Sequence, residues 1–228
     1  MCIFHTPKNP HSDLITVSSY KMPPSDTRFF TEDWVITLPS HPDVKFIRIT
    51  PPLFDERMKL IADPLNHPFG SSAVKEEWTP IKIEESRHRF IDQHNLSKTK
   101  YRALDVLVQV GGEIVGQGGV HEIPMVKAGL ANMGLSLVES ARGKGLGKVT
   151  MQVLLRLSNE LDVDIVHAGT MLANKPMRAL AATLGFTERE EVLSIPGRGV
   201  VAELLFENVD YKKFKDLDMN VEFTGPAP

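Results

Sequence analysis

The sequence predicts an α/β domain with a mixed sheet and helices on its faces. Apolar residues switch between strand and helix spacing through the middle of the chain. Gly111-Gly112 joins two apolar runs, a strong hairpin signal because such turns need positive φ. A helical stretch separates the strand-like segments Leu130–Val138 and Ile165–Thr170, as a parallel connection requires. With 228 residues, we expect one ordinary domain with additional terminal segments.

The first half of this domain has a strand, two helices and a hairpin. The strand is expected near Val44–Ile49. Four apolar residues at helical spacing then predict a helix that ends at Asp63-Pro64: Phe54, Met58, Ile61 and Leu65. A second helix is expected within Ile81–Asn95. The hairpin strands are Leu104–Val110 and Glu113–Val120.

The second half alternates strands and helices. Between the two strands of the expected parallel pair lies an amphipathic helix, Gly147–Leu161. The helix Asn174–Leu184 follows, with Asn174 as its N-cap and Gly185 as its terminating glycine. Two strands, Glu190–Ile195 and Val200–Phe206, close the core around a Pro196-Gly197 turn. The element order is therefore strand, two helices, three strands, helix, strand, helix and two strands.

The domain is expected to span residues 44–208. Prolines interrupt residues 1–43, which predicts a poorly structured arm, although the apolar pieces Leu14–Val17 and Trp34–Ile36 leave added edge strands open. Residues 209–228 are expected to be a frayed polar tail.

Composition excludes several classes of protein. A single cysteine, Cys2, excludes an internal disulfide and a thiolate zinc cluster. A formal net charge of −3 disfavours nucleic acid as a partner, and no apolar run reaches the roughly 20 residues of a membrane span. The N-terminus lacks the basic-then-apolar pattern of a secretory signal, so a cytoplasmic protein is expected.

The sharpest local feature is the glycine-rich loop Arg142–Lys148 before an amphipathic helix. Alternating glycines let the backbone approach a ligand closely, and the helix N-terminus and basic side chains favour an anion, so the loop suits a diphosphate. The alternative is a flexible turn with solubilising lysines. A P-loop would need glycine at Arg142 and a hydroxyl at Val149, and a dinucleotide fingerprint would need glycine at Lys148.

The loop resembles the pyrophosphate motif of the GNAT N-acetyltransferases, Arg/Gln-x-x-Gly-x-Gly/Ala, here Arg142, Gly145 and Gly147. A second family feature is similar: Asn174 opens a helix that ends in Leu-Gly-Phe, here 184–186. Within the family, the chain looks most like the ribosomal-protein-alanine acetyltransferase branch. The resemblance implies a mostly antiparallel mixed sheet of about six to seven strands, helices on both faces, and parallel strands four and five that splay apart.

The resemblance also implies acetyl-CoA as co-substrate, and no residue cluster has the spacing of metal ligands. Pantetheine would pair with backbone near Leu137 and Val138, and Asn174 would touch its arm. The diphosphate would lie on the loop, whose candidate residues are Arg142, Gly143, Lys144, Gly145, Leu146, Gly147 and Lys148. The acceptor would be a small-molecule amine or a peptide N-terminus attacking the thioester directly, and a homodimer stays open.

The chain departs from the family where the proton must be moved. An alkylamine of pKa about 10.4 loses its proton at pH 7 at a cost of about 4–5 kcal/mol, so a base is needed. Family members often place a glutamate where this chain has Asn132, and a tyrosine acid where it has Ala181. His121 and Glu122, at the end of a strand, are the candidate bases.

Other titratable residues are given structural interpretations. Glu139 is expected to be a solvated or capping carboxylate, and His167 a satisfied core histidine rather than a catalyst. Three hypotheses follow: an N-acetyltransferase for a primary amine, a CoA-binding protein without transfer activity that acts as a sensor or assembly partner, and, more weakly, transfer to a hydroxyl or of a longer acyl group.

Overall fold

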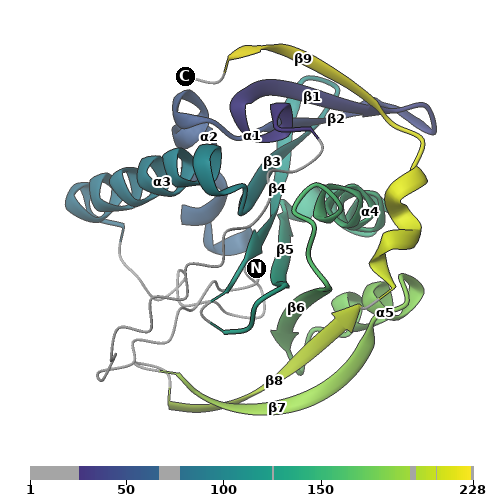
Figure 1. Ribbon diagram of the computed structural model, residues 1–228. Helices are drawn as coiled ribbons and strands as arrows, with labels where there is room; N and C mark the ends of the chain where they lie inside the picture. The colour runs from purple at the N-terminus through teal and green to yellow at the C-terminus, as the bar shows by residue number, and fades with distance from the viewer. Residues whose placement is uncertain (1–25, 67–77, 125, 196–198, 209, 227–228) are drawn as a thin grey trace.

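The computed structural model describes residues 26–66, 78–124, 126–195, 199–208 and 210–226. One mixed sheet runs through it in the order β7-β8-β6-β5-β4-β3-β2-β1-β9 (Figure 1). Its strands are β1 (Glu32–Leu38), β2 (His41–Arg48), β3 (Ala103–Val110), β4 (Glu113–Glu122), β5 (Leu130–Leu137), β6 (Ile165–Met171), β7 (Thr187–Ile195), β8 (Gly199–Asn208) and β9 (Asn220–Pro226). All pairs are antiparallel except β5 with β6, so the predicted α/β fold with a mixed sheet is confirmed.

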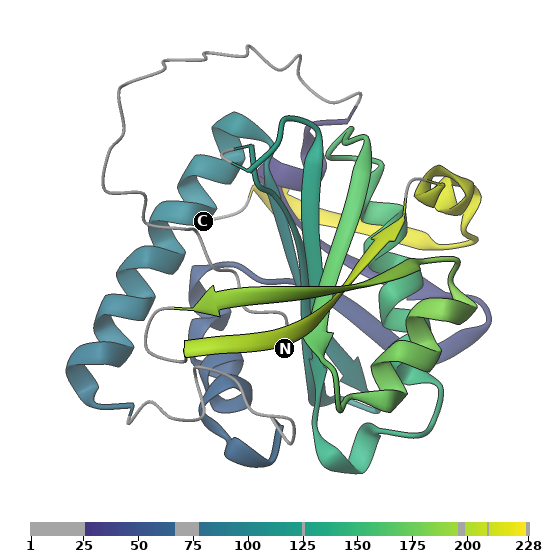
Figure 2. The same ribbon diagram turned by 90° about the horizontal axis from the view of Figure 1, so that it is seen from below.

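Helices cover both faces of the sheet (Figure 2). They are α1 (Arg28–Thr31), α2 (Phe54–Ala62), α3 (Pro80–Lys100), α4 (Leu146–Ser158) and α5 (Lys175–Thr183). Short 3₁₀ helices are η1 (Pro51–Leu53), η2 (Pro64–Asn66), η4 (Glu139–Ala141) and η5 (Tyr211–Asp216). Helices α2 and α3 lie on one face and α4 and α5 on the other, which divides the core into two clusters.

Capping residues and turn glycines set the ends of several of these elements. Thr79 caps α3 by accepting a hydrogen bond from the Lys82 N–H, and Tyr101 ends it in the left-handed region. Gly111 and Gly112 turn the β3–β4 hairpin with φ of 59° and 93°. The helix α3 extends five residues beyond the expected Asn95, because its last turns pack on β3.

Residues 26–43 are not the poorly structured arm that the prolines indicated. They form α1, β1 and the start of β2, and β1 buries alternate residues that include Trp34. The Trp34 indole donates to the Phe29 carbonyl at 2.9 Å. Buried Arg48 donates to the carbonyls of Glu32 and Phe30, and burial lowers its pKa to about 10. Residues 1–25, with Leu14–Val17 and Cys2, lie outside the described residues.

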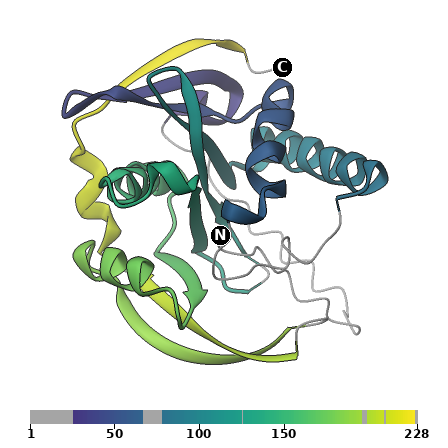
Figure 3. The same ribbon diagram turned by 180° about the vertical axis from the view of Figure 1, so that it is seen from behind.

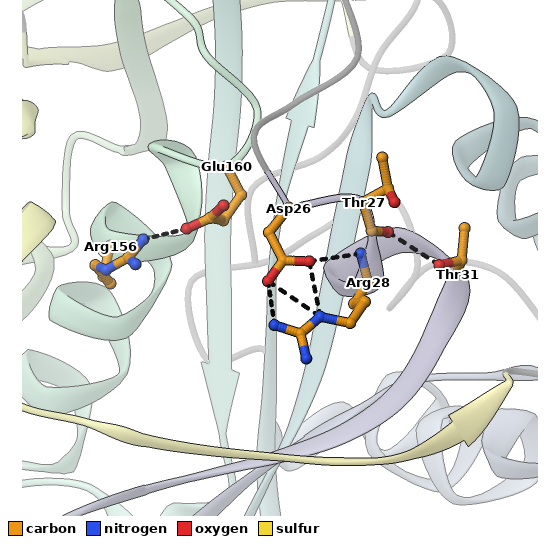
Figure 4. Close-up of polar contacts among 6 residues, drawn as sticks. All are labelled: Asp26, Thr27, Arg28, Thr31, Arg156 and Glu160. Carbon is orange, nitrogen blue, oxygen red and sulfur yellow. Dashed lines mark hydrogen bonds and ion pairs between the residues drawn. The ribbon is translucent and has the colours of Figure 1, made fainter.

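Figure 4 shows two ion pairs, one within this first segment and one at the end of α4. Asp26 accepts hydrogen bonds from the backbone and guanidinium of Arg28, which lower the pKa of the Asp26 carboxyl. On α4, Arg156 reaches Glu160 one turn later at 2.5 Å. These contacts fix the entry to α1 and the end of α4.

The C-terminal segment is ordered rather than frayed. After β8, η5 packs on α4 and the chain returns to the opposite edge of the sheet, where β9 pairs with β1 (Figure 3). Tyr211 is fully buried and donates its hydroxyl to the Val163 carbonyl; burial raises the pKa of this phenol to about 12. In the described residues the sheet has nine strands, two more than the upper expectation of seven, because β1 and β9 come from segments outside the expected domain.

We predict that Tyr211→Phe lowers the free energy of unfolding by about 1–2 kcal/mol. The change removes only the hydroxyl and leaves the Val163 carbonyl buried without its donor. Urea denaturation followed by circular dichroism measures it. Lys212→Ala, at an exposed position of the same 3₁₀ helix, is the control and should change stability by less than about 0.5 kcal/mol.

Candidate active site

The two parallel strands form a wedge. β5 and β6 pair only from Leu130 with Ile165 to Met133 with Ala168. Beyond this point the described residues of β5 and β6 no longer pair with each other, and β6 continues beside β8. We call the last pair, Met133 with Ala168, the wedge apex. The predicted parallel, diverging strands are confirmed, and an extended ligand could add backbone hydrogen bonds at the open edge of β5.

The glycine-rich loop lies at the open end of the wedge, between η4 and α4. Gly143 and Gly145 have φ of 72° and 81°, and an added Cβ at either would meet no atom within 4 Å. The N–H groups of residues 143–147 have no acceptor among the residues that the structure describes. These amides and the positive end of the α4 dipole suit a diphosphate, so the loop fits the expected group.

Arg142 holds the loop rather than facing outward from it. Its Nε donates to the Leu137 carbonyl at 3.0 Å and its Nη2 to the Leu65 carbonyl at 2.9 Å. Its own N–H donates to the Glu139 carbonyl at 3.1 Å. The guanidinium therefore links the end of β5 to η2, a contact between distant segments that the motif alone did not indicate.

The remaining loop residues divide into anchors and exposed cations. Leu146 is buried, whereas Lys144 and Lys148 are exposed, and the Lys148 N–H donates to the Gly145 carbonyl. Leu137 is buried at the end of β5. The Val138 N–H donates to the Val115 carbonyl of β4 at 2.9 Å, so this amide is engaged within the sheet.

Asn174 lies across the wedge, after β6. Its Oδ1 accepts from the Met177 N–H at 3.2 Å, which confirms the predicted N-cap of α5, and its Nδ2 donates to Thr170 Oγ1 at 2.8 Å. Ala181, where related enzymes often carry a tyrosine, is fully buried in the core. The space around it is filled by protein.

A row of polar side chains crosses the sheet just before the wedge apex. Register pairs His121 of β4 with Asn132 of β5, Asn132 with His167 of β6, and His167 with Glu207 of β8. Paired residues share a face of a sheet. Asp105 of β3 lies on the same face, because His121 Nε2 is 2.8 Å from its Oδ1. We call these five residues the polar row.

The polar row contains two histidine–carboxylate pairs, one on each side of Asn132. His167 Nε2 lies 2.8 Å from Glu207 Oε1, so this mostly buried histidine is satisfied by a carboxylate partner, as expected. Asp105 shares its face with Leu107, which packs with Phe90 of α3. The polar row therefore faces α2 and α3. Asp105 and Glu207 were missed because their partners are distant in sequence; polar residues within apolar strands were the available signal.

The structure separates the two candidate bases. Because side chains alternate along a strand, Glu122 faces the opposite side of the sheet from His121. There it lies 3.6 Å from the Arg102 guanidinium, with an 8% exposed side chain. Glu139 begins η4 at an exposed position. Of the two candidate bases, only His121 lies beside the wedge apex on the face of the polar row.

Several basic side chains surround the Asp105 carboxylate. Burial alone would raise its pKa, but His121 at 2.8 Å, with Arg57 and His94 adding to its effect, lowers it below the ordinary value. A cavity of about 20 Å³, room for about one water molecule, lies beside Asp105 between α3 and the sheet. The carboxylate is thus ionised and accepts hydrogen bonds only.

The fold and the wedge are those of a class of α/β protein with two diverging parallel strands and a glycine-rich loop before the following helix. The model of the acetyltransferase (GNAT) family matches residues 71–186, half of the chain, and the chain belongs to this family. No curated protein matches it in sequence.

Solved structures share the fold at low sequence identity. RimJ of Mycobacterium smegmatis, in complex with CoA-disulfide, superposes with a TM-score of 0.62 at 18% identity, covering 79% of this chain and 89% of that one. An acetyltransferase of Salmonella typhimurium that modifies the N-terminal serine of a ribosomal protein gives 0.58 at 16%, covering 76% and 98%. A spermidine N-acetyltransferase chimera from Vibrio cholerae and hSSAT gives 0.57 at 12%, covering 76% and 99%. The neighbours thus include ribosomal-protein acetyltransferases, the branch that the motifs resemble.

Two further observations concern the described part of the chain. None of its helices is long and apolar enough to cross a bilayer. The histidine and acidic residues of this described part form no group of three or more that could hold a metal ion.

We predict that Asp105→Asn lowers the free energy of unfolding at pH 7 by about 1.5–3 kcal/mol, the contribution of a hydrogen bond to a charged group. Because the folded pKa of Asp105 is lowered, its stabilisation is present above the unfolded value of 3.8 and is lost as pH falls through the folded value. The difference between wild type and variant should therefore shrink below pH 4. Urea denaturation between pH 2.5 and 7 tests this, with exposed Asp92→Asn of α3 as control.

Proposed function

We propose that this protein transfers an acetyl group from acetyl-CoA to a primary amine by direct attack. The observation that carries the proposal is the placement of the loop and the polar row at opposite ends of one wedge. Acetyl-CoA supplies an activated thioester, and the chain must bind it, orient it and remove a proton from the acceptor.

The wedge fixes the direction of the ligand. With its diphosphate on the amides of residues 143–147, the pantetheine arm would run along β5 between Leu137 and Met133. The thioester then lies near the apex, next to Asn132 and His121. The acceptor would approach from the face that carries the polar row, because the candidate base His121 lies on that face.

His121 is the base in this proposal. Asn132 cannot take a proton at neutral pH, and Glu122 faces away. His121 accepts one proton from the ammonium of the acceptor, the amine nitrogen bonds to the acyl carbon, and the C–S bond breaks. The proton that nitrogen loses on becoming an amide goes to the CoA thiolate. A thiol pKa near 8.5 leaves about 2 kcal/mol for acid assistance at pH 7, which makes a tyrosine at Ala181 dispensable.

The acceptor class is an amine of small molecules or of peptide N-termini. The structural neighbours include an enzyme for the N-terminal serine of a ribosomal protein and a spermidine N-acetyltransferase, which support both. An α-amino group, of pKa near 7.7–8.0, would lose its proton to His121 at a lower free-energy cost than an alkylamine would.

A CoA-binding protein without transfer activity is the second candidate. It is favoured by Asn132 and Ala181, which stand where related enzymes often carry a base and an acid. Release of free thiol from acetyl-CoA in the presence of an amine library separates the two. Amine-dependent release supports transfer, and CoA binding without release at any pH supports the second candidate.

We predict that Gly145→Val abolishes CoA binding. The Cβ branch would occupy the open space beside the loop amides, and φ of 81° is strained for valine. Calorimetry with CoA and with desulfo-CoA measures it without knowledge of the acceptor. Gly112→Val is a matched control, since Gly112 also has positive φ and open space but lies in the distant β3–β4 turn. Equal binding by Gly145→Val and wild type would contradict the diphosphate site.

We predict that His121→Gln lowers kcat by about 10²–10⁴-fold and removes the limb of the pH–rate profile that reports a histidine. The Kd for CoA should stay within about twofold, because the loop is untouched. His167→Gln is the control, being a histidine of the same row with a carboxylate partner. A profile lost in His167→Gln but kept in His121→Gln would assign the base to β6 instead.

A further inference from the structure

We propose that Asp105 is a positioning residue that holds His121 in the tautomer able to take the acceptor's proton, and that Gly119 provides the opening in which the two side chains meet. This inference rests on the proposed function, because it concerns how His121 is made ready. Asp105 touches His121 and is not itself placed against substrate.

The opening at Gly119 is the first observation. Register places Gly119 of β4 directly opposite Asp105 of β3, and His121 follows two residues later on the same face. A Cβ at Gly119 would lie 2.2 Å from Asp105 Oδ1 and 3.2 Å from His121 Nε2. Real Cβ atoms do not approach so closely, so any side chain there would displace the carboxylate from the ring. The Asp105–His121 contact requires glycine at this position.

The direction of the hydrogen bond is the second observation. An ionised carboxylate only accepts, so the proton between the two residues belongs to His121 Nε2. In the neutral ring, the lone pair is then on Nδ1. The carboxylate therefore determines which nitrogen acts as base, and it stabilises the imidazolium once the proton has arrived.

The charges around Asp105 keep it ionised. Arg57 of α2 and His94 of α3 act on it from the helices above the sheet, and Arg48 of β2 adds positive charge from the neighbouring strand. Asn132 is the paired residue on the other side of His121 and carries no charge. No second carboxylate acts on Asp105 among the groups that shift its pKa.

The second pair of the polar row differs in its surroundings. Glu207 is 34% exposed and also lies 3.7 Å from the Arg189 guanidinium, whereas the Asp105 side chain is 18% exposed. A carboxylate shared with an arginine and with solvent fixes a histidine less firmly. Glu207→Gln should therefore lower kcat less than Asp105→Asn does.

The kinetic test uses the full chain with acetyl-CoA, following thiol release with spermidine and with a serine-N-terminal peptide as acceptors. Asp105→Asn should lower kcat by about 10²-fold or more and change the pH–rate profile, with KM for acetyl-CoA and Kd for CoA within about twofold. Gly119→Ala should give the same pattern, Asp105→Glu should restore part of kcat, and Asp92→Asn, at an exposed position of α3, should match wild type. A wild-type profile in Asp105→Asn would overturn the inference while leaving the proposed function standing.

A second, spectroscopic test does not depend on enzymatic turnover. Long-range ¹H–¹⁵N correlation spectra of the histidine side chains report which ring nitrogen carries the proton. In the neutral ring, wild-type His121 should carry the proton on Nε2. The His121 signal is assigned by its loss in His121→Gln. A proton on Nδ1 would overturn the inference. If neither acceptor releases thiol and CoA does not bind, the proposed function fails, and the tautomer still decides whether Asp105 orients His121.

Discussion

The brief pairing of β5 with β6 is the constraint on which the rest of the site depends. Hydrogen bonds join these strands only up to Met133 and Ala168, after which β6 stays with β8. A fully paired sheet would leave no room for a ligand between the strands. Because they diverge, one end of the wedge faces the amides of the loop before α4, and the other end meets the polar row.

Two adjacent glycines of β4 leave space on opposite faces of the sheet beside this wedge. A Cβ at Gly118 would lie 2.9 Å from Leu154, so α4 packs directly on the strand. One residue later, Gly119 gives the space on the other face to Asp105 and His121. Side chains alternate along a strand, so adjacent glycines serve opposite faces. The dense core on one face and the His121–Asp105 hydrogen bond on the other therefore share one short segment.

The terminal segments stabilise the same domain from the far edge. β1 and β9 pair with each other, and Trp34, Tyr211 and their neighbours join the core cluster that contains α4. The helix whose N-terminus forms the loop is thus enclosed by chain from both ends of the sequence. A rigid α4 keeps the loop amides in place at the end of the wedge.

The sequence by itself determined the features that depend on neighbouring residues. Positive φ in the Gly111-Gly112 turn, the Asn174 cap and the amphipathic α4 are local effects, and each was predicted; so were the family and the diverging parallel pair. Only the tertiary structure shows that Arg142 binds the Leu65 carbonyl, that β1 pairs with β9, and that Asp105 contacts His121. These contacts join residues from 16 to about 190 positions apart, and strand register, which no local propensity encodes, brings them together.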